Sequence, residues 1–547
     1  MSFAQIDFGL PPLAAENSPD FTDEDGARAW LAVLPLTNVA LTQTQLLRQL
    51  RLLNDYPVRT GERLKILELL REPIDFVQDQ CRMRFAGRPL PFNTLEQAAF
   101  DSGQALWQEL VAGYLHCLHA APEAADDAAL APHLLASLAA TRALATMSAV
   151  HLDACQANFL TAPFFWRQLH LIYRAAEKLK VTQLPVEDSV HGKKTAASAF
   201  VEPLLVAAAW PIELRSRQVS SVADWAQRWA RKVTILRQPP ADQRTPALCV
   251  DLDSDEPAAF RHHVAMNDAL RWLDLTELRK SLKKRLMLLA QGEPPQALQL
   301  GTGCEQPACE ALLKRTYQCW CKGGLKGNTI RLAARTKSTC QLVSGLEPIH
   351  YWLTGQKNLK QDRSIYLGNR QHDEIATFGH IPTHCDEETR EAPGFMLEEW
   401  RIVDQDATAL QLERPLNPPG RPLVREQLVA VRMHEGEGFM LGKLCWIAMS
   451  ASRDALIARI QLFPGRPEGI TIRDSGPGCG HAQDSRCLFL PEVEQVGEMA
   501  SMLVPTAWFS ADRIVAVEAQ AKDARLIRLD RLVERGADFE RVAFHWQ

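Results

Sequence analysis

The sequence contains no long hydrophobic run. Its first 26 residues lack the charged region followed by an apolar stretch that marks a secretory signal. No later segment approaches the roughly 18 uninterrupted apolar residues that are typical of a membrane-spanning helix. We therefore expect a cytoplasmic protein without a membrane span.

Signatures of the common enzyme classes are also absent. The sequence has no G-x-S-x-G, P-loop, G-x-G-x-x-G or H-E-x-x-H motif, and no set of protein-kinase motifs. Such motifs supply activated nucleophiles, phosphate-binding loops and metal-bound hydroxide. Their absence predicts that the protein is not an enzyme and carries no cofactor.

The chain has no excess of positive charge. Its 61 Lys and Arg residues against 66 Asp and Glu residues give a formal net charge of -5 at pH 7. Binding to nucleic acid needs a net basic face for the phosphates, so nucleic acid is an unlikely partner. A basic stretch from Arg279 to Arg285 lies within a leucine-rich helical pattern, and we interpret it as a solvated helix face.

Cysteines are numerous, but they are not arranged as metal sites. The 13 cysteines are scattered through a long chain, and an odd number cannot pair completely. The most closely spaced ones lack the paired C-x2-C knuckles of a zinc site; they are Cys304, Cys309, Cys319 and Cys321. We predict reduced, mostly buried thiols.

Two further groups of metal-binding residue types are also loosely arranged. His380, His384 and Cys385 form H-x3-H-C, but Pro382 weakens the helix that would align the two imidazoles. The acidic segment 251–256 lacks the central Gly and the distal Glu of a calcium-binding EF-hand. We predict loops here and no metal, although an unrecognised metalloenzyme is the hypothesis that these groups would support.

Helical periodicity dominates the first half of the chain. At 547 residues the chain should form about three or four domains. Residues 1–22 read as a flexible tail, residues 23–190 as a helical bundle, and residues 191–325 as a mixed, mostly helical domain. The helical segments carry leucines at spacings of three and four residues, as in Leu46, Leu50, Leu53, Leu64, Leu67 and Leu70, and further segments lie near 93–120, 128–151 and 163–181.

Strand patterns replace helical ones after about residue 326. Short alternating apolar runs are separated by turns rich in Gly and Pro, which is typical of antiparallel sheets. We expect one β-barrel over residues 326–463, interrupted by an insertion at 356–399. Residues 464–547 are predicted to be a linker, over about 464–485, followed by a second small β domain. The fold class is therefore multidomain α+β, with a helical N-terminal half and antiparallel β-barrel units.

One pair of motifs resembles a known receptor module. Arg331-Leu-Ala-Ala-Arg335 precedes a strand-like run over 338–350, and Asp404-Gln-Asp406-Ala-Thr-Ala409 follows downstream. The order resembles PilZ domains, which pair an RxxxR arm with a D/N-x-S-x-x-G turn. Asp406 stands in the Ser place and Ala409 in the Gly place, so Asp406 is expected to put an unpaired anion beside the ligand. Trp400 and the run 441–446 also fit such a barrel.

The resemblance implies a bacterial signalling protein that binds cyclic di-GMP. Arg331 and Arg335 would stack on the purines and bind the phosphates, close to Asp404, Asp406 and Ala409. Binding would pass a signal to a protein partner whose identity the sequence does not reveal. The alternative is a degenerate PilZ-like scaffold that binds protein partners without a nucleotide.

Overall fold

The computed structural model describes eleven stretches of the chain. They are residues 6–14, 16–122, 131–188, 192–240, 247–261, 267–324, 338–355, 395–433, 438–474, 485–519 and 525–547. The chain divides into two compact units, a helical unit (1–330 and 448–455) and a barrel unit (331–447 and 456–547).

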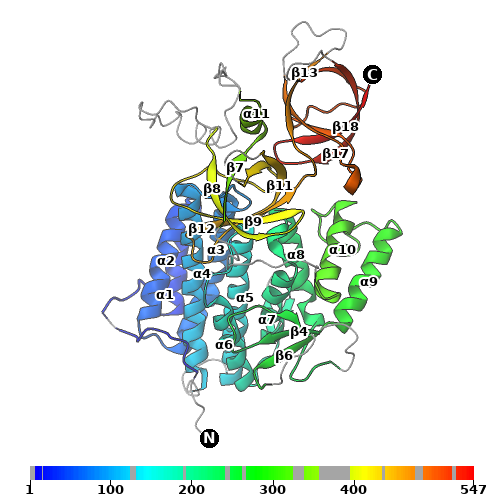
Figure 1. The fold of residues 1–547 in the computed structure, drawn as a ribbon. Coiled ribbons are helices and arrows are strands. Elements are labelled where there is room, and N and C mark those ends of the chain that lie inside the picture. Colours follow the sequence, from blue (N-terminus) through cyan, green and yellow to red (C-terminus); the bar gives the residue numbers. More distant parts are fainter. Residues whose placement is uncertain are drawn as a thin grey trace, which may run out of the picture. The chain divides into compact units, whose positions relative to one another are not determined.

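The helical unit begins with long amphipathic helices (Figure 1). Leucines that recur every three or four residues in the sequence are fully buried between them, including Leu46, Leu50, Leu67 and Leu70. The predicted bundle is confirmed. Its helices are α1 (Glu24–Ala32), α2 (Val39–Asp55), α3 (Thr60–Phe85), α4 (Thr94–Ala120), α5 (Pro132–Gln156) and α6 (Phe165–Lys178).

Residues 191–325, predicted as a separate mixed domain, do mix helices with short strands but belong to the same compact unit as the bundle. Trp225, Trp229 and Trp320 are buried with the helices of the bundle in one core. The four-stranded sheet has the strand order β3-β6-β4-β5. The elements are β1 (Val186–Asp188), β2 (Gly192–Lys194), α7 (Ala196–Ala208), α8 (Ser216–Trp229), β3 (Thr234–Leu236), β4 (Ala247–Asp251), β5 (Ala259–Arg261), β6 (Leu270–Asp274), α9 (Thr276–Ala290) and α10 (Ala308–Cys321).

The acidic loop after β4 caps a helix that has no cap of its own. The residue before α6, Phe164, cannot cap the helix with its side chain. Instead, the Asp255 carboxylate accepts hydrogen bonds from the backbone N–H groups of Phe164 and Arg167, at 2.6 and 3.0 Å. Nearby, Arg174 pairs with Asp253 at 2.6 Å. The acidic residues therefore satisfy a helix N-terminus, where negative charge is favourable.

The first barrel of the barrel unit closes six antiparallel strands in the order β10-β11-β12-β9-β8-β7. Trp400 and Trp446 are buried in its strands, as their pattern indicated. The strands are β7 (Thr339–Ser344), β8 (Glu398–Gln405), β9 (Ala409–Pro415), β10 (Leu428–Arg432), β11 (Met440–Met449) and β12 (Ala455–Leu462).

The predicted strand over 338–350 is wrong in its second half. β7 ends at Ser344, and helix α11 (Leu346–Thr354) follows. Gly345 has a φ of 92°, a conformation that glycine adopts without strain, and this allows the change of direction. Leu346 and Ile349 of α11 are buried, so their apolar character reflects helix packing. Of the predicted insertion, residues 356–394 lie outside the described residues and residues 398–399 begin β8.

The second barrel is also closed, with the strand order β13-β14-β15-β18-β17-β16. The interpretation of 464–485 as a linker is wrong over Glu468–Asp474, which form β13. Ile470 and Ile472 alternate there and are buried, although the neighbouring Gly and Pro residues suggested a loop. The other strands are β14 (Ser485–Leu490), β15 (Ser501–Val504), β16 (Ile514–Ala519), β17 (Arg525–Arg535) and β18 (Glu540–Trp546).

None of the helices in the described stretches is both long enough and apolar enough to span a bilayer.

Candidate functional site

The predicted ligand turn connects β8 to β9 on the first barrel. Asp404 lies near the end of β8, opposite Gln411 of β9, next to a register shift between Ile402 and Asp404. Asp406 and Thr408 form the exposed turn, and Ala409 begins β9. The three predicted turn residues therefore lie together at one edge of the barrel.

The Asp406 carboxylate holds this turn in shape. One oxygen accepts hydrogen bonds from the backbone N–H groups of Thr408 and Ala409, both at 2.8 Å, and from the Thr408 hydroxyl at 2.9 Å. The other oxygen pairs with the Arg459 guanidinium of β12 at 3.2 Å. The donated backbone hydrogen bonds, the first of them from Thr408, lower the pKa of Asp406 below its usual value. The expectation of an unpaired anion is therefore wrong, because Arg459 compensates the charge.

The methyl group of Ala409 leaves no open space in the turn. Ala409 is only 2% exposed, and its N–H donates to Asp406. The close backbone approach that glycine permits is not available at this position. A ligand at this edge would therefore contact the exposed Thr408 and the side chains of Asp406 and Arg459 before it reached the backbone of Ala409.

Strand β7 begins beside this turn. Thr339 pairs with Arg401 of β8, and the carbonyl of Ser338 accepts a hydrogen bond from the N–H of Ile402 at 2.9 Å. Antiparallel pairing brings the start of one strand to the end of its neighbour. The chain therefore enters β7 at the barrel edge that carries Asp404 and Asp406, even though about 60 residues separate the two segments. Arg331 and Arg335 lie outside the described residues.

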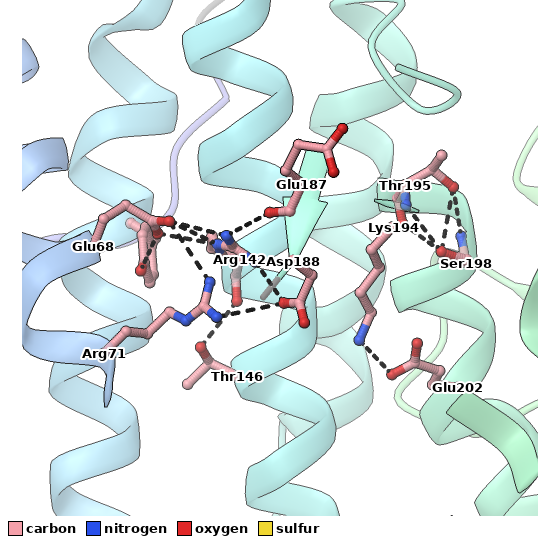
Figure 2. A network of polar contacts seen from close by, with 11 residues as sticks. Glu68, Arg71, Arg142, Thr146, Glu187, Asp188, Lys194, Thr195, Ser198 and Glu202 are labelled. Atoms are coloured by element: carbon pink, nitrogen blue, oxygen red, sulfur yellow. Dashed lines mark hydrogen bonds and ion pairs between the residues drawn. The ribbon is translucent and has the colours of Figure 1, made fainter. Parts of the chain in front are cut away.

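A second cluster of charged groups lies inside the helical unit (Figure 2). Arg142 of α5 donates to both oxygens of the Glu68 carboxylate, at 2.9 to 3.1 Å, and to Asp188 of β1 at 2.9 Å. It also donates to the backbone carbonyl of Glu187 at 3.0 Å. Arg71 lies within 3.4 Å of Asp188. Beside them, Lys194 of β2 and Glu202 of α7 form a buried pair at 2.8 Å.

The charges of this cluster balance one another. Three cations, Arg71, Arg142 and Lys194, face the carboxylates of Glu68, Asp188 and Glu202. Burial raises the pKa of Glu202, and the Lys194 ammonium opposes that shift. A cavity of about 250 Å³ lies beside the pairs. Since the ions pair among themselves, the cluster fastens the β1–β2 hairpin to α3, α5 and α7, and we assign it no ligand.

Sequence reasoning missed this cluster, although one signal was present. Arg142 is the only charged residue between His133 and His151, a stretch of α5 otherwise made of Ala, Leu and other small or apolar residues. A buried arginine in such a helix needs a carboxylate partner from another element. The partners themselves, Glu68 and Asp188, lie far away in the sequence and have no pattern that identifies them.

Among the described residues, no group of three or more His, Cys, Asp or Glu side chains could hold a metal ion. Cys304 and Cys309 form a disulfide, which corrects the prediction that all thiols are reduced. Cys319 and Cys321 are free and buried. His380, His384 and Cys385 lie outside the described residues.

Comparison with known proteins identifies the class to which the two ends of the chain are similar. Residues 25–241, in the helical unit, match the family model described as "Cyclic-di-GMP receptor FimW, N-terminal domain". Residues 471–546, in the second barrel, match the "FimW C-terminal beta-barrel domain". The chain is therefore similar to a family of cyclic di-GMP receptors at both ends.

A particular relative carries the same name. The cyclic-di-GMP receptor FimW of Pseudomonas aeruginosa PAO1 is 27% identical over 220 residues, which are 40% of this chain and 35% of that protein. The chain thus matches about a third of the length of this curated relative. No solved structure matches the chain. Neither family model covers residues 242–470, so the PilZ resemblance of the first barrel stays a prediction.

Proposed function

We propose that this protein is a cyclic di-GMP receptor that regulates a protein partner. The observation that carries the proposal is the match of two separate parts of the chain to domains of one receptor family. A regulatory role also agrees with the absence of the common catalytic motifs from the sequence.

The proposed ligand site is the edge of the first barrel that carries the β8–β9 turn. Arg331 and Arg335 precede β7, and β7 starts beside Ile402 of β8. A guanidinium group can bind two phosphate oxygens at once, donate to the N7 and O6 edge of guanine, or stack on a purine ring. In this proposal the two arginines hold the ligand against Asp404, Asp406 and Ala409.

Arg459 supplies a reason why a turn with an aspartate can still accept an anionic ligand. It pairs with Asp406 and remains about a quarter exposed, with 26% of its side chain accessible. A phosphate that approaches the turn meets an ion pair with little net charge. The backbone hydrogen bonds to Asp406 hold the carboxylate in place, so Arg459 can share its remaining donors with the ligand.

Regulation requires that cyclic di-GMP bind two states of the protein with different affinity. An arm that changes from free to ligand-bound would alter the surface that the barrel offers to another protein. We propose that this surface recruits or releases the partner. The chemistry of that partner is not specified by the site.

The first test is calorimetric titration of the full chain with cyclic di-GMP. Saturable binding in the wild type and its loss in the Arg331→Ala, Arg335→Ala double variant would support the proposal. A double variant of two exposed arginines on β17, Arg528→Ala with Arg531→Ala, removes the same charge elsewhere and should bind normally. Binding that survives the first double variant would place the site elsewhere.

The alternative, a scaffold that binds protein partners without a nucleotide, is favoured by the turn itself. Asp406 uses three hydrogen bonds to hold the turn closed, and Ala409 fills the place of the glycine. The scaffold predicts no heat and no thermal shift at high concentrations of cyclic di-GMP. The same titration therefore separates the two functions.

A further inference from the structure

A larger cleft lies in the helical unit, away from the charged cluster. It has a volume of about 440 Å³, within the range of small-molecule sites. It is lined by α4, α5, the segment that leads into α6, and residues 451 and 453, which belong to the same unit. Neither the predicted site nor the charged cluster includes it.

Phenylalanine rings form much of the cleft wall. Phe100 and Phe159 lie with their ring centroids 4.4 Å apart. Phe164, at the rim, is 66% exposed, which is unusual for so large an apolar side chain. Rings that stand open to solvent in this way can stack on a flat aromatic ligand such as a nucleobase.

The backbone holds Phe164 in this exposed position at a cost. Its φ is 66°, in the left-handed region that residues other than glycine rarely adopt. The Asp255 carboxylate fixes the conformation by accepting the N–H of Phe164 at 2.6 Å. Strained residues are often found at binding sites, where their surroundings hold them in the strained conformation.

The charged groups that line the cleft are both cations. Arg453 lies over the rings of Phe100 and Phe159, with 5.2 and 5.7 Å to their centroids, and pairs with Asp101 behind them at 2.5 Å. The guanidinium of Arg167 is exposed and has no partner among the described residues. None of the described lining residues is Asp or Glu. Asp101 and Asp255 offset part of this positive charge, and the guanidinium of Arg167 offers the free donors for an anion such as a phosphate.

Three glutamines add a polar edge with both donors and acceptors. Gln108 and Gln168 have side-chain amides without a partner among the described residues, and Gln104 uses only its NH2 group, toward the carbonyl of Val150 at 3.3 Å. A glutamine amide matches the N6 donor and N7 acceptor of adenine, whereas guanine presents two acceptors there and suits Arg or Lys. A carboxylate, which pairs with the N1 and N2 donors of guanine together, is absent from the described lining residues.

We propose that this cleft binds an adenine nucleotide. The base stacks on Phe164 and bonds to the glutamine amides, and the phosphate binds Arg167 and Arg453. The site is separate from the barrel edge, so the inference does not rest on cyclic di-GMP binding.

Calorimetric titration of the full chain with AMP tests this directly, with GMP and cyclic di-GMP as separate arms. We expect saturable AMP binding that weakens at least about tenfold in a Phe164→Ala, Arg167→Ala double variant, which corresponds to about 1.4 kcal/mol. Both residues are exposed, so the fold should tolerate the changes. The matched control removes an exposed Phe and an exposed Arg elsewhere, Phe76→Ala with Arg48→Ala, and should bind AMP normally.

The remaining arms separate this inference from the proposed function. AMP binding should persist in the Arg331→Ala, Arg335→Ala variant, whatever that variant does to cyclic di-GMP. The inference fails if AMP does not bind, if the Phe164 and Arg167 changes leave AMP affinity unaltered, or if GMP binds as tightly as AMP. Loss of cyclic di-GMP binding alone would concern the barrel site and not this cleft.

Discussion

Arg142 joins α5 to α3 and β1 of the helical unit through buried polar contacts. Its side chain is 7% exposed and bonds to Glu68, Asp188 and the carbonyl of Glu187. Replacement by Met would leave Arg71, at 3.6 and 3.4 Å, as the remaining cation beside the carboxylates of Glu68 and Asp188. We expect Arg142→Met to lower the free energy of unfolding by about 3 kcal/mol, the lower end of the range for removing one partner of a buried ion pair.

Urea denaturation of the full chain, followed by the fluorescence of the buried tryptophans, measures this change. Arg48 of α2 is exposed and has no ion pair among the described residues, so Arg48→Met serves as the matched control. The control should alter stability by no more than about 0.5 kcal/mol. Equal effects of the two changes would show that the buried network contributes nothing beyond a surface arginine.

At the residue scale the sequence indicated only part of what the site contains. It located Asp404, Asp406 and Ala409 in a turn, because turn motifs are local. It did not show that Arg459 would pair with Asp406, since the two are 53 residues apart and meet only when the barrel closes. Phe164 had no sequence signal at all, because its exposure follows from a backbone conformation that Asp255 holds.

At the scale of the element, helix α6 depends on a cap from another part of the chain. Asp255 accepts two N–H groups at the helix start and lies 91 residues away from Phe164. We expect Asp255→Ala to cost about 1 kcal/mol of stability, which is typical for loss of an N-cap. Glu256→Ala is the control, since Glu256 is exposed and makes no contact with α6 among the described residues.

Thermal or urea denaturation of the two variants compares them directly. The Asp255 variant should also exchange its amide protons faster in the first turn of α6, because those N–H groups lose their acceptor. If both variants retained wild-type stability and exchange rates, the carboxylate would not act as a cap.

The periodicity of apolar residues predicted the long helices and most strands. It failed where a short strand contains or adjoins Gly and Pro, which usually mark turns. Gly469 lies inside β13, and prolines at 464, 467 and 477 surround it, so the alternation of Ile470 and Ile472 was outweighed. The pairing of β13 with β14 and β16 is a tertiary property that the local sequence cannot reveal. The long connection between β7 and β8 similarly concealed that the two strands are neighbours.

At the scale of the whole barrel unit, the two barrels are linked through a buried carboxyl group. The tip of the β17–β18 hairpin contacts the start of β10, where Asp538 accepts the N–H of Leu428 at 2.8 Å. Burial raises the pKa of Asp538 to about 6, and the hydrogen bond from Leu428 opposes this shift. The folded protein therefore holds this proton more tightly than the unfolded chain does.

The contribution of Asp538 to stability is fully present below its unfolded pKa of 3.8 and is lost as the pH rises through about 6. Asp538→Asn keeps an oxygen for the Leu428 N–H and cannot ionise. Between pH 4 and pH 7, the free energy of unfolding should fall by about 1–3 kcal/mol less in the variant than in the wild type. Urea denaturation at each pH measures this difference. Parallel pH profiles would contradict the burial of a titrating group at this contact.

We propose that cyclic di-GMP binds the barrel edge where β7 starts and β8 turns into β9. Amide hydrogen exchange of the full chain with and without saturating cyclic di-GMP tests both the binding and its place. The account predicts slower exchange at the start of β7 and over residues 402–409, with the second barrel unchanged. Exchange that is unaltered at this edge, whether because no ligand binds or because protection appears only elsewhere, would contradict the account.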